Sequence, residues 1–164
     1  MIMDLKEIYE LTAKAFETNH VKELLLGKGE WCVPVNWKAP ANTPTDWDRI
    51  IYFGVHAYCK GENCVNRVAQ FEEAFISILK ESTSSIMAGF ELYFSYWYHI
   101  FDHSEENILF TPRLKKELAQ AIKSNKTKLS AVTEWSGYKY RTGLYDNIVY
   151  LNNTIEKKFG AGIL

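Results

Sequence analysis

The sequence predicts an all-α protein, a single-domain bundle of six or seven helices formed by residues 1–164 around one buried aromatic helix. Three observations predict this fold. Apolar residues recur at helical spacing along most of the chain, Gly, Asn, Ser and Pro interrupt that spacing, and one segment is apolar on nearly every side. With 47% hydrophobic and 15% aromatic residues, a chain of 164 residues can bury a sizeable core as one domain.

The first half of the chain predicts four helices and one long loop. Amphipathic spacing indicates a helix over residues 5–16 and a short one over 21–26. Residues 27–44 hold three of the four prolines of the chain, so we expect a loop there. Apolar stripes then indicate helices over residues 50–58 and 65–79, which Gly61 separates.

The second half predicts three further helices after a central one. The central helix spans residues 86–102 and is apolar all round, which is typical of a buried helix; we expect Phe90, Phe94, Trp97 and Phe101 at the centre of the fold. Thr111 followed by Pro112 is a typical helix start, because Thr caps the first turn and Pro needs no amide partner there. The last two helices are expected over residues 127–135 and 144–155, and no set of strands is expected.

The net charge is −1, but it is unevenly spread along the chain. Residues 1–110 hold 9 Lys and Arg against 16 Asp and Glu, whereas residues 111–164 hold 10 against 4. Such an asymmetry indicates either a charged partner or helical faces that attract each other within the domain.

The cysteine count and the hydropathy indicate the cytoplasm. Three cysteines are too few and uneven for a secreted disulfide scaffold. The first residues are charged from Asp4 on, which differs from a signal peptide, and no stretch approaches the roughly eighteen uncharged apolar residues of a membrane helix. We therefore expect a cytoplasmic protein that does not act in a membrane.

Two groups of residues could hold a metal ion. His99 and His103 lie four residues apart with Asp102 between them, similar to the inverted zinc-protease pattern, but a third ligand is not evident. Alternatively they form the polar end of the aromatic helix. His56, Cys59 and Cys64, with Cys32 from the loop, could form a structural zinc site, although buried cysteines acting as small apolar residues explain them equally simply. We expect no metal and no cofactor.

Two surfaces could bind a partner. The basic stretch over residues 113–141 could contact nucleic acid, but the sequence pI of about 6.4 and the lack of a known nucleic-acid motif favour a solvated helix face. Tryptophans on the proline-rich loop stand near carboxylates, which is typical of a surface that binds a basic protein. The candidate partner-binding residues are Trp31, Trp37, Asp46, Trp47, Asp48, Glu62, Glu72 and Glu73.

Motifs of common enzyme classes are missing from the sequence. It has no Gly-rich dinucleotide fingerprint, no phosphate-binding Gly-Lys-Ser/Thr loop and no Gly-x-Ser-x-Gly nucleophile turn. A small, helical, aromatic-rich chain of this kind resembles the immunity proteins of bacterial toxin systems, including those of contact-dependent growth inhibition. The resemblance is one of general character along the whole chain and carries over no functional residue.

The resemblance implies a cytoplasmic bacterial protein that binds a cognate toxin, often a basic nuclease, and covers its active site. We therefore expect a non-catalytic protein-binding module that neutralises a toxin. One alternative is a nucleic-acid-associated helical protein that uses residues 113–141. The other is a metal-dependent hydrolase that uses His99 and His103.

Overall fold

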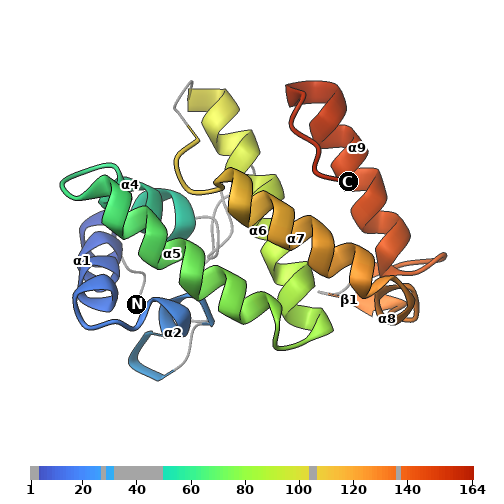
Figure 1. The fold of residues 1–164 in the computed structure, drawn as a ribbon, viewed down its shortest axis with the longest axis horizontal. Helices are drawn as coiled ribbons and strands as arrows, with labels where there is room; N and C mark the ends of the chain where they lie inside the picture. The colour runs from blue at the N-terminus through green and yellow to red at the C-terminus, as the bar shows by residue number, and fades with distance from the viewer. Residues whose placement is uncertain (1–3, 27–28, 32–49, 104–106, 136–137) are drawn as a thin grey trace. The chain divides into compact units, whose positions relative to one another are not determined.

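The structure, a computed structural model, describes residues 4–26, 29–31, 50–103, 107–135 and 138–164 (Figure 1). Within these residues the fold is all-α with bundle-like helix packing, as predicted, and it holds eight α-helices and almost no sheet. The expected number was six or seven; short helices of three and five residues add to the total. No helix in the described ranges is long and apolar enough to cross a membrane.

The contacts divide the chain into two compact units. The N-terminal unit comprises Met1–Ser77 and Glu106–Leu109, and the C-terminal unit comprises Ile78–Glu105 and Phe110–Leu164. The two units differ in charge. The N-terminal unit has 8 Lys and Arg against 12 Asp and Glu, a net of −4, and the C-terminal unit has 11 against 8, a net of +3.

The N-terminal unit consists of short helices that follow one another closely. Its described elements are α1 (Leu5–Glu17), α2 (Val21–Leu26), the 3₁₀ turn η1 (Gly29–Trp31), the π-helix η2 (Ile50–His56), α4 (Ala57–Cys59) and α5 (Cys64–Leu79), which continues beyond the unit at Ser77. The Asp4 carboxylate caps α1 by accepting the N–H of Glu7 at 2.8 Å. Asn19, in the left-handed region with φ 58°, separates α1 from α2 as expected from the sequence.

A π-helix takes the place of the α-helix predicted over residues 50–58. The prediction of a helix was right, but its type was wrong, because periodicity alone does not separate the wider π turn from an α turn. η2 packs on α1, and Gly54 lies so close to Thr12 and Ile8 that a Cβ atom there would collide with the Thr12 hydroxyl. A glycine is therefore required where these two helices meet.

The C-terminal unit is built around α6. Its elements are α6 (Thr83–His103), α7 (Pro112–Ser124), α8 (Lys126–Ser130), the hairpin strands β1 (Glu134–Trp135) and β2 (Tyr138–Lys139), and α9 (Leu144–Phe159). α6 packs against both α7 and α9 (Figure 1). The predicted start at Thr111 is confirmed, since its hydroxyl accepts the N–H of Leu114 at 3.2 Å; α6 begins three residues before its predicted start, and the Ser82 hydroxyl there accepts the N–H of Ser85 at 3.1 Å.

The aromatic helix is buried, although not at every predicted position. Phe90 is fully buried, as expected, together with Tyr93 and Tyr96. Phe94 and Trp97 are only half-buried, which corrects their predicted place at the centre. Phe94 lies next to fully buried Tyr93 in the middle of α6, so one side of this helix is less covered than the other. The side chain of Phe101 lies outside the described part of the chain.

The chain after α7 departs most from the prediction. The helix expected over residues 127–135 is present but shorter: α8 ends at Ser130, and Trp135 pairs with Tyr138 in the hairpin. The Trp135 indole N–H donates to the Glu91 carboxylate on α6 at 2.9 Å, a contact between distant residues that local patterning cannot indicate. The last helix is confirmed, and Gly160 ends it in the left-handed conformation with φ 63°.

Candidate functional site

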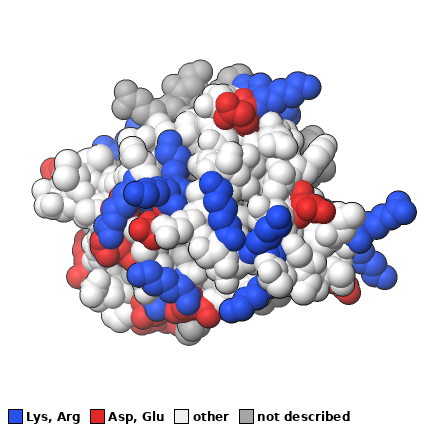
Figure 2. All heavy atoms as spheres, turned by 45° about the vertical axis from the view of Figure 1, so that its right-hand side comes forward, with Lys and Arg blue, Asp and Glu red and all other residues white. Residues whose placement is uncertain are grey.

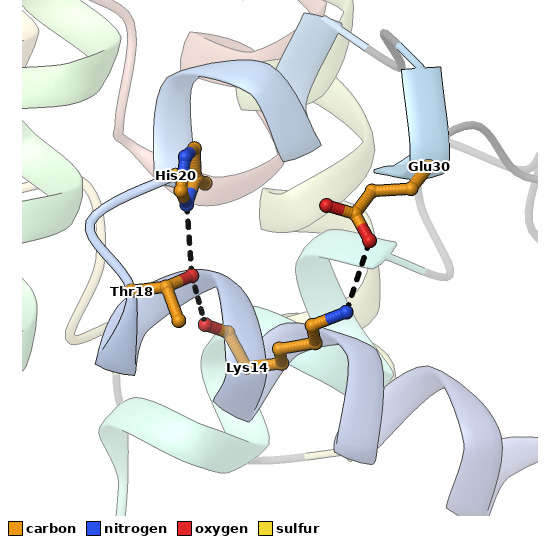
Figure 3. Close-up of polar contacts among 4 residues, drawn as sticks. All are labelled: Lys14, Thr18, His20 and Glu30. Carbon is orange, nitrogen blue, oxygen red and sulfur yellow. Dashed lines mark hydrogen bonds and ion pairs between the residues drawn. The ribbon is translucent and has the colours of Figure 1, made fainter.

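Trp31, one of the predicted partner-binding residues, is buried and only 4% exposed. The His20 ring stacks on its indole with 5.3 Å between centroids, and Lys14 Nζ lies 5.4 Å from the indole centroid. Lys14 also forms an ion pair of 2.9 Å with Glu30 of η1 (Figure 3). In this arrangement the Trp31 side chain contributes to the packing of the N-terminal unit and presents little surface to a partner.

The polar contacts beneath Trp31 determine the tautomer of His20. The single hydroxyl proton of Thr18 is donated to the carbonyl oxygen of Lys14 at 2.6 Å (Figure 3). The Thr18 oxygen must then act as the acceptor in its 2.8 Å contact with His20, so His20 Nδ1 carries a proton and donates it. A chain of hydrogen bonds therefore runs from His20 through Thr18 to the Lys14 carbonyl oxygen and orients the His20 ring that stacks on Trp31.

The remaining predicted residues divide into two sets. Trp37, Asp46, Trp47 and Asp48 lie outside the described residues, and their role stays a prediction. The other three belong to the N-terminal unit: Glu62 and Glu73 are exposed, and Glu72 is half-buried. Two carboxylates of the predicted surface are therefore exposed. Glu62 lies between α4 and α5, and Glu73 lies in α5.

Among the described residues of the N-terminal unit, three large apolar side chains are exposed. Leu5 is 52% exposed and Tyr9 41%, one turn apart on α1, and Val65 on the first turn of α5 is 82% exposed. The apolar spacing over residues 5–16 and 65–79 predicts that all three face the core. That prediction is wrong because apolar spacing does not show which positions of a stripe the neighbouring elements cover.

An aromatic and cationic stack joins α1 to the start of α5. Tyr9 makes an edge contact with Tyr58 at 5.8 Å between centroids, and the Arg67 guanidinium lies 3.8 Å from the Tyr58 ring. Arg67 also donates to the Tyr58 carbonyl oxygen at 2.8 Å. Burial is the main cause that raises the pKa of the Tyr58 hydroxyl, although Arg67 acts in the opposite direction. Tyr9 is therefore held in place by a packed neighbour while part of its ring stays in solvent.

We call Leu5, Tyr9, Glu62 and Val65 the acidic-apolar surface. Its members come from α1 and from the turn into α5, and the Tyr9–Tyr58–Arg67 stack connects these two elements. Large exposed apolar side chains beside carboxylates are typical of protein-binding surfaces. The sequence shows that Leu5 and Tyr9 lie at the edge of the apolar stripe of α1. Only the packing of the neighbouring elements shows that this edge is exposed.

The described members of the predicted cysteine site, His56, Cys59 and Cys64, do not come together around a common point that could hold a metal ion. His56 and Cys59 are buried and Cys64 is half-buried. Burial, reinforced by Cys64, raises the pKa of the Cys59 thiol to about 12, so the thiol is protonated at neutral pH. Within the described ranges no three His, Cys, Asp or Glu residues come together to hold a metal ion; Cys32 and the side chains of His99 and His103 are outside those ranges.

The basic stretch of residues 113–141 is distributed over several elements, and only part of it lines a groove. Lys115, Lys116 and Lys123 on α7 line an open groove of roughly 570 Å³ together with the chain after α9. The other lining residues are Pro112, Ala119, Gln120, Gly162 and Ile163. Figure 2 shows Lys and Arg side chains on the face that it displays, with Asp and Glu side chains interspersed among them. Lys128 and Lys139 are exposed on α8 and β2, apart from the groove lining.

Comparison with known proteins adds no assignment. No protein-family model, no curated protein and no solved structure matches the chain.

Proposed function

We propose that this chain is a non-catalytic protein-binding protein of the bacterial cytoplasm that neutralises a toxin, and that its acidic-apolar surface contacts a basic region of that toxin. The observation that carries the proposal is the exposure of Leu5, Tyr9 and Val65, three large apolar side chains of the N-terminal unit, which also exposes the Glu62 carboxylate. Burying such side chains against a partner gains the apolar free energy that the isolated chain leaves unused.

The net charge of the N-terminal unit also favours a basic protein partner. The N-terminal unit carries a net charge of −4, so it attracts a basic protein and speeds its association. Glu62 makes no hydrogen bond or ion pair with the described residues, which leaves its carboxylate available to a partner. Asp46 and Asp48, which the sequence predicts to bind the partner, contribute two of the carboxylates of this unit.

The anchoring residues differ from those that the sequence favoured. Trp31 is buried by His20 and Lys14, so Tyr9 and Val65 are better candidates for the described part of the surface. Trp37 and Trp47 stay candidates from the sequence. A tyrosine supported by a packed neighbour loses little conformational freedom on binding, which favours it as an anchor.

The test uses growth protection. Cells that express the protein encoded by the reading frame next to this gene should stop growing, and co-expression of this chain should restore growth. Tyr9→Ser with Val65→Ser should reduce protection and weaken binding of the purified pair by at least about 2 kcal/mol, the size of an interface hot spot. Tyr138→Ser with Tyr150→Ser is the matched control, because both tyrosines are exposed in the C-terminal unit.

Two results would contradict the proposal. Equal loss of protection in both variants would mean that the acidic-apolar surface contributes no more to toxin binding than exposed tyrosines elsewhere on the chain. A purified chain that hydrolyses a substrate, with turnover lost in His99→Ala, would support the hydrolase alternative.

A further inference from the structure

The groove along α7 has the size of a small-molecule site. Its volume of roughly 570 Å³ falls within the usual range for ligand pockets, about 300 to 1,000 Å³. All of its lining residues belong to the C-terminal unit, so the groove is formed within one compact part of the chain.

Three lysines of α7 line this groove. Lys115, Lys116 and Lys123 lie within nine residues and make no ion pair among the described residues. The Glu156 carboxylate, which is near the groove, is engaged by the N–H of Gly162 at 2.7 Å. Three positive charges that line one groove without a carboxylate partner among the described residues favour an anion that carries several charges.

The chain after α9, which contributes Gly162 and Ile163 to the groove, is held by several hydrogen bonds. Asn152 is buried, and its Oδ1 accepts the N–H of Ile163 at 2.7 Å and that of Leu164 at 3.2 Å. The Tyr93 hydroxyl donates to the carbonyl oxygen of Ala161, and burial raises the pKa of that hydroxyl, which keeps it a donor at neutral pH. The chain after α9 is therefore fixed at several points, and the groove is formed before any ligand arrives.

The lining chemistry favours phosphate over nucleic-acid bases. Lysine binds phosphate as a point charge, and the Gln120 amide adds hydrogen-bond donors. The eight lining residues include no aromatic side chain, so the groove itself lacks the platform on which unpaired bases stack. Pro112, Ala119 and Ile163 supply small apolar contacts that suit a compact ligand.

We propose that the groove between α7 and the chain after α9 binds a small ligand that carries two or more phosphate groups. The site lies in the C-terminal unit and goes beyond the proposed toxin binding, since no residue of the acidic-apolar surface lines it. Either proposal can fail while the other holds.

In the experiment, the full chain is titrated with inorganic pyrophosphate at low ionic strength, and calorimetry measures the heat of binding. We expect one pyrophosphate per chain. Lys116→Ala with Lys123→Ala should weaken binding roughly tenfold or more, because two charge-assisted contacts are lost. Lys128→Ala with Lys139→Ala removes the same charge from exposed positions outside the groove and should weaken binding less than threefold, by screened long-range attraction alone.

A second readout reports the position of the ligand. Lys115 Nζ lies 5.8 Å from the Trp97 ring centroid, so a phosphate that draws this ammonium group away should change the Trp97 emission. Trp97→Phe should remove that fluorescence change and retain calorimetric binding. Inorganic phosphate should bind more weakly than pyrophosphate, and a nucleoside diphosphate should compete with pyrophosphate if its phosphates occupy the groove.

Several outcomes would overturn the proposal. Absence of pyrophosphate binding, or equal weakening in the two lysine pairs, would mean that the groove is no site. Binding of single-stranded oligonucleotides that strengthens with length and is not displaced by pyrophosphate would indicate a nucleic-acid surface instead. Tighter binding of a glutamate-rich peptide than of pyrophosphate would indicate an acidic protein segment.

Discussion

The two units carry opposite net charges, although each leaves some large apolar side chains exposed. The N-terminal unit is acidic and exposes Leu5, Tyr9 and Val65, whereas the C-terminal unit is basic and exposes Tyr138 and Tyr150. Charge therefore separates the two units more clearly than apolar exposure does. Under the two proposals, a protein partner and a phosphate ligand bind to different units of one helical chain whose net charge is −1.

The largest expected effect concerns the core of the C-terminal unit. Phe90→Ala should lower the free energy of unfolding by about 3–5 kcal/mol, because a fully buried ring is lost and a cavity remains. Phe94→Ala, one turn later on the same helix and only half-buried, should cost clearly less. Urea denaturation of both variants measures the difference. Equal costs would mean that α6 is covered evenly along its length.

An intermediate effect compares the helix caps of the two units. Thr111→Ala removes the acceptor of the Leu114 N–H and should cost about 0.5–2 kcal/mol. Asp4→Ala removes the acceptor of the Glu7 N–H and should cost a similar amount in the N-terminal unit. Thermal unfolding measures both, with Thr111→Ser and Asp4→Asn as controls that keep a capping oxygen. Controls as unstable as the alanine variants would show that the caps contribute little.

The smallest effect is expected at the ion pair beside Trp31. Lys14 and Glu30 are both exposed, with 56% and 64% of their side-chain surface in solvent, so their attraction is strongly screened. A double-mutant cycle of Lys14→Met and Glu30→Gln should give a coupling of less than about 1 kcal/mol. A much larger coupling would mean that this pair, and not the buried indole, stabilises η1.

The helices that the sequence predicted correctly are those with local signals. Thr111 with Pro112 marked the start of α7, and Gly160 marked the end of α9, because caps act within one turn. The hairpin at Trp135 depends on Glu91, which lies 44 residues earlier, and no local pattern contains that contact. The π geometry of η2 likewise depends on packing against α1.

The candidate sites were less predictable than the fold. Tryptophan content indicated a binding surface, but burial of Trp31 by His20 shows that composition does not separate an anchor from a core residue. The basic stretch was visible in the sequence as a run of charge. Which of its lysines line one groove depends on the chain after α9 returning to α7, and that is tertiary information.

The central claim is that the acidic unit, and not the basic one, engages the toxin, and paired charge reversals test it most directly. Glu62→Lys with Val65→Lys alters the acidic-apolar surface, and Lys128→Glu with Lys139→Glu alters exposed positions of the C-terminal unit outside the groove. Growth protection and the association rate with the purified toxin are measured for both. The account predicts loss of protection and slower association in the first variant only. Protection that survives the first pair of changes and is lost with the second would contradict it.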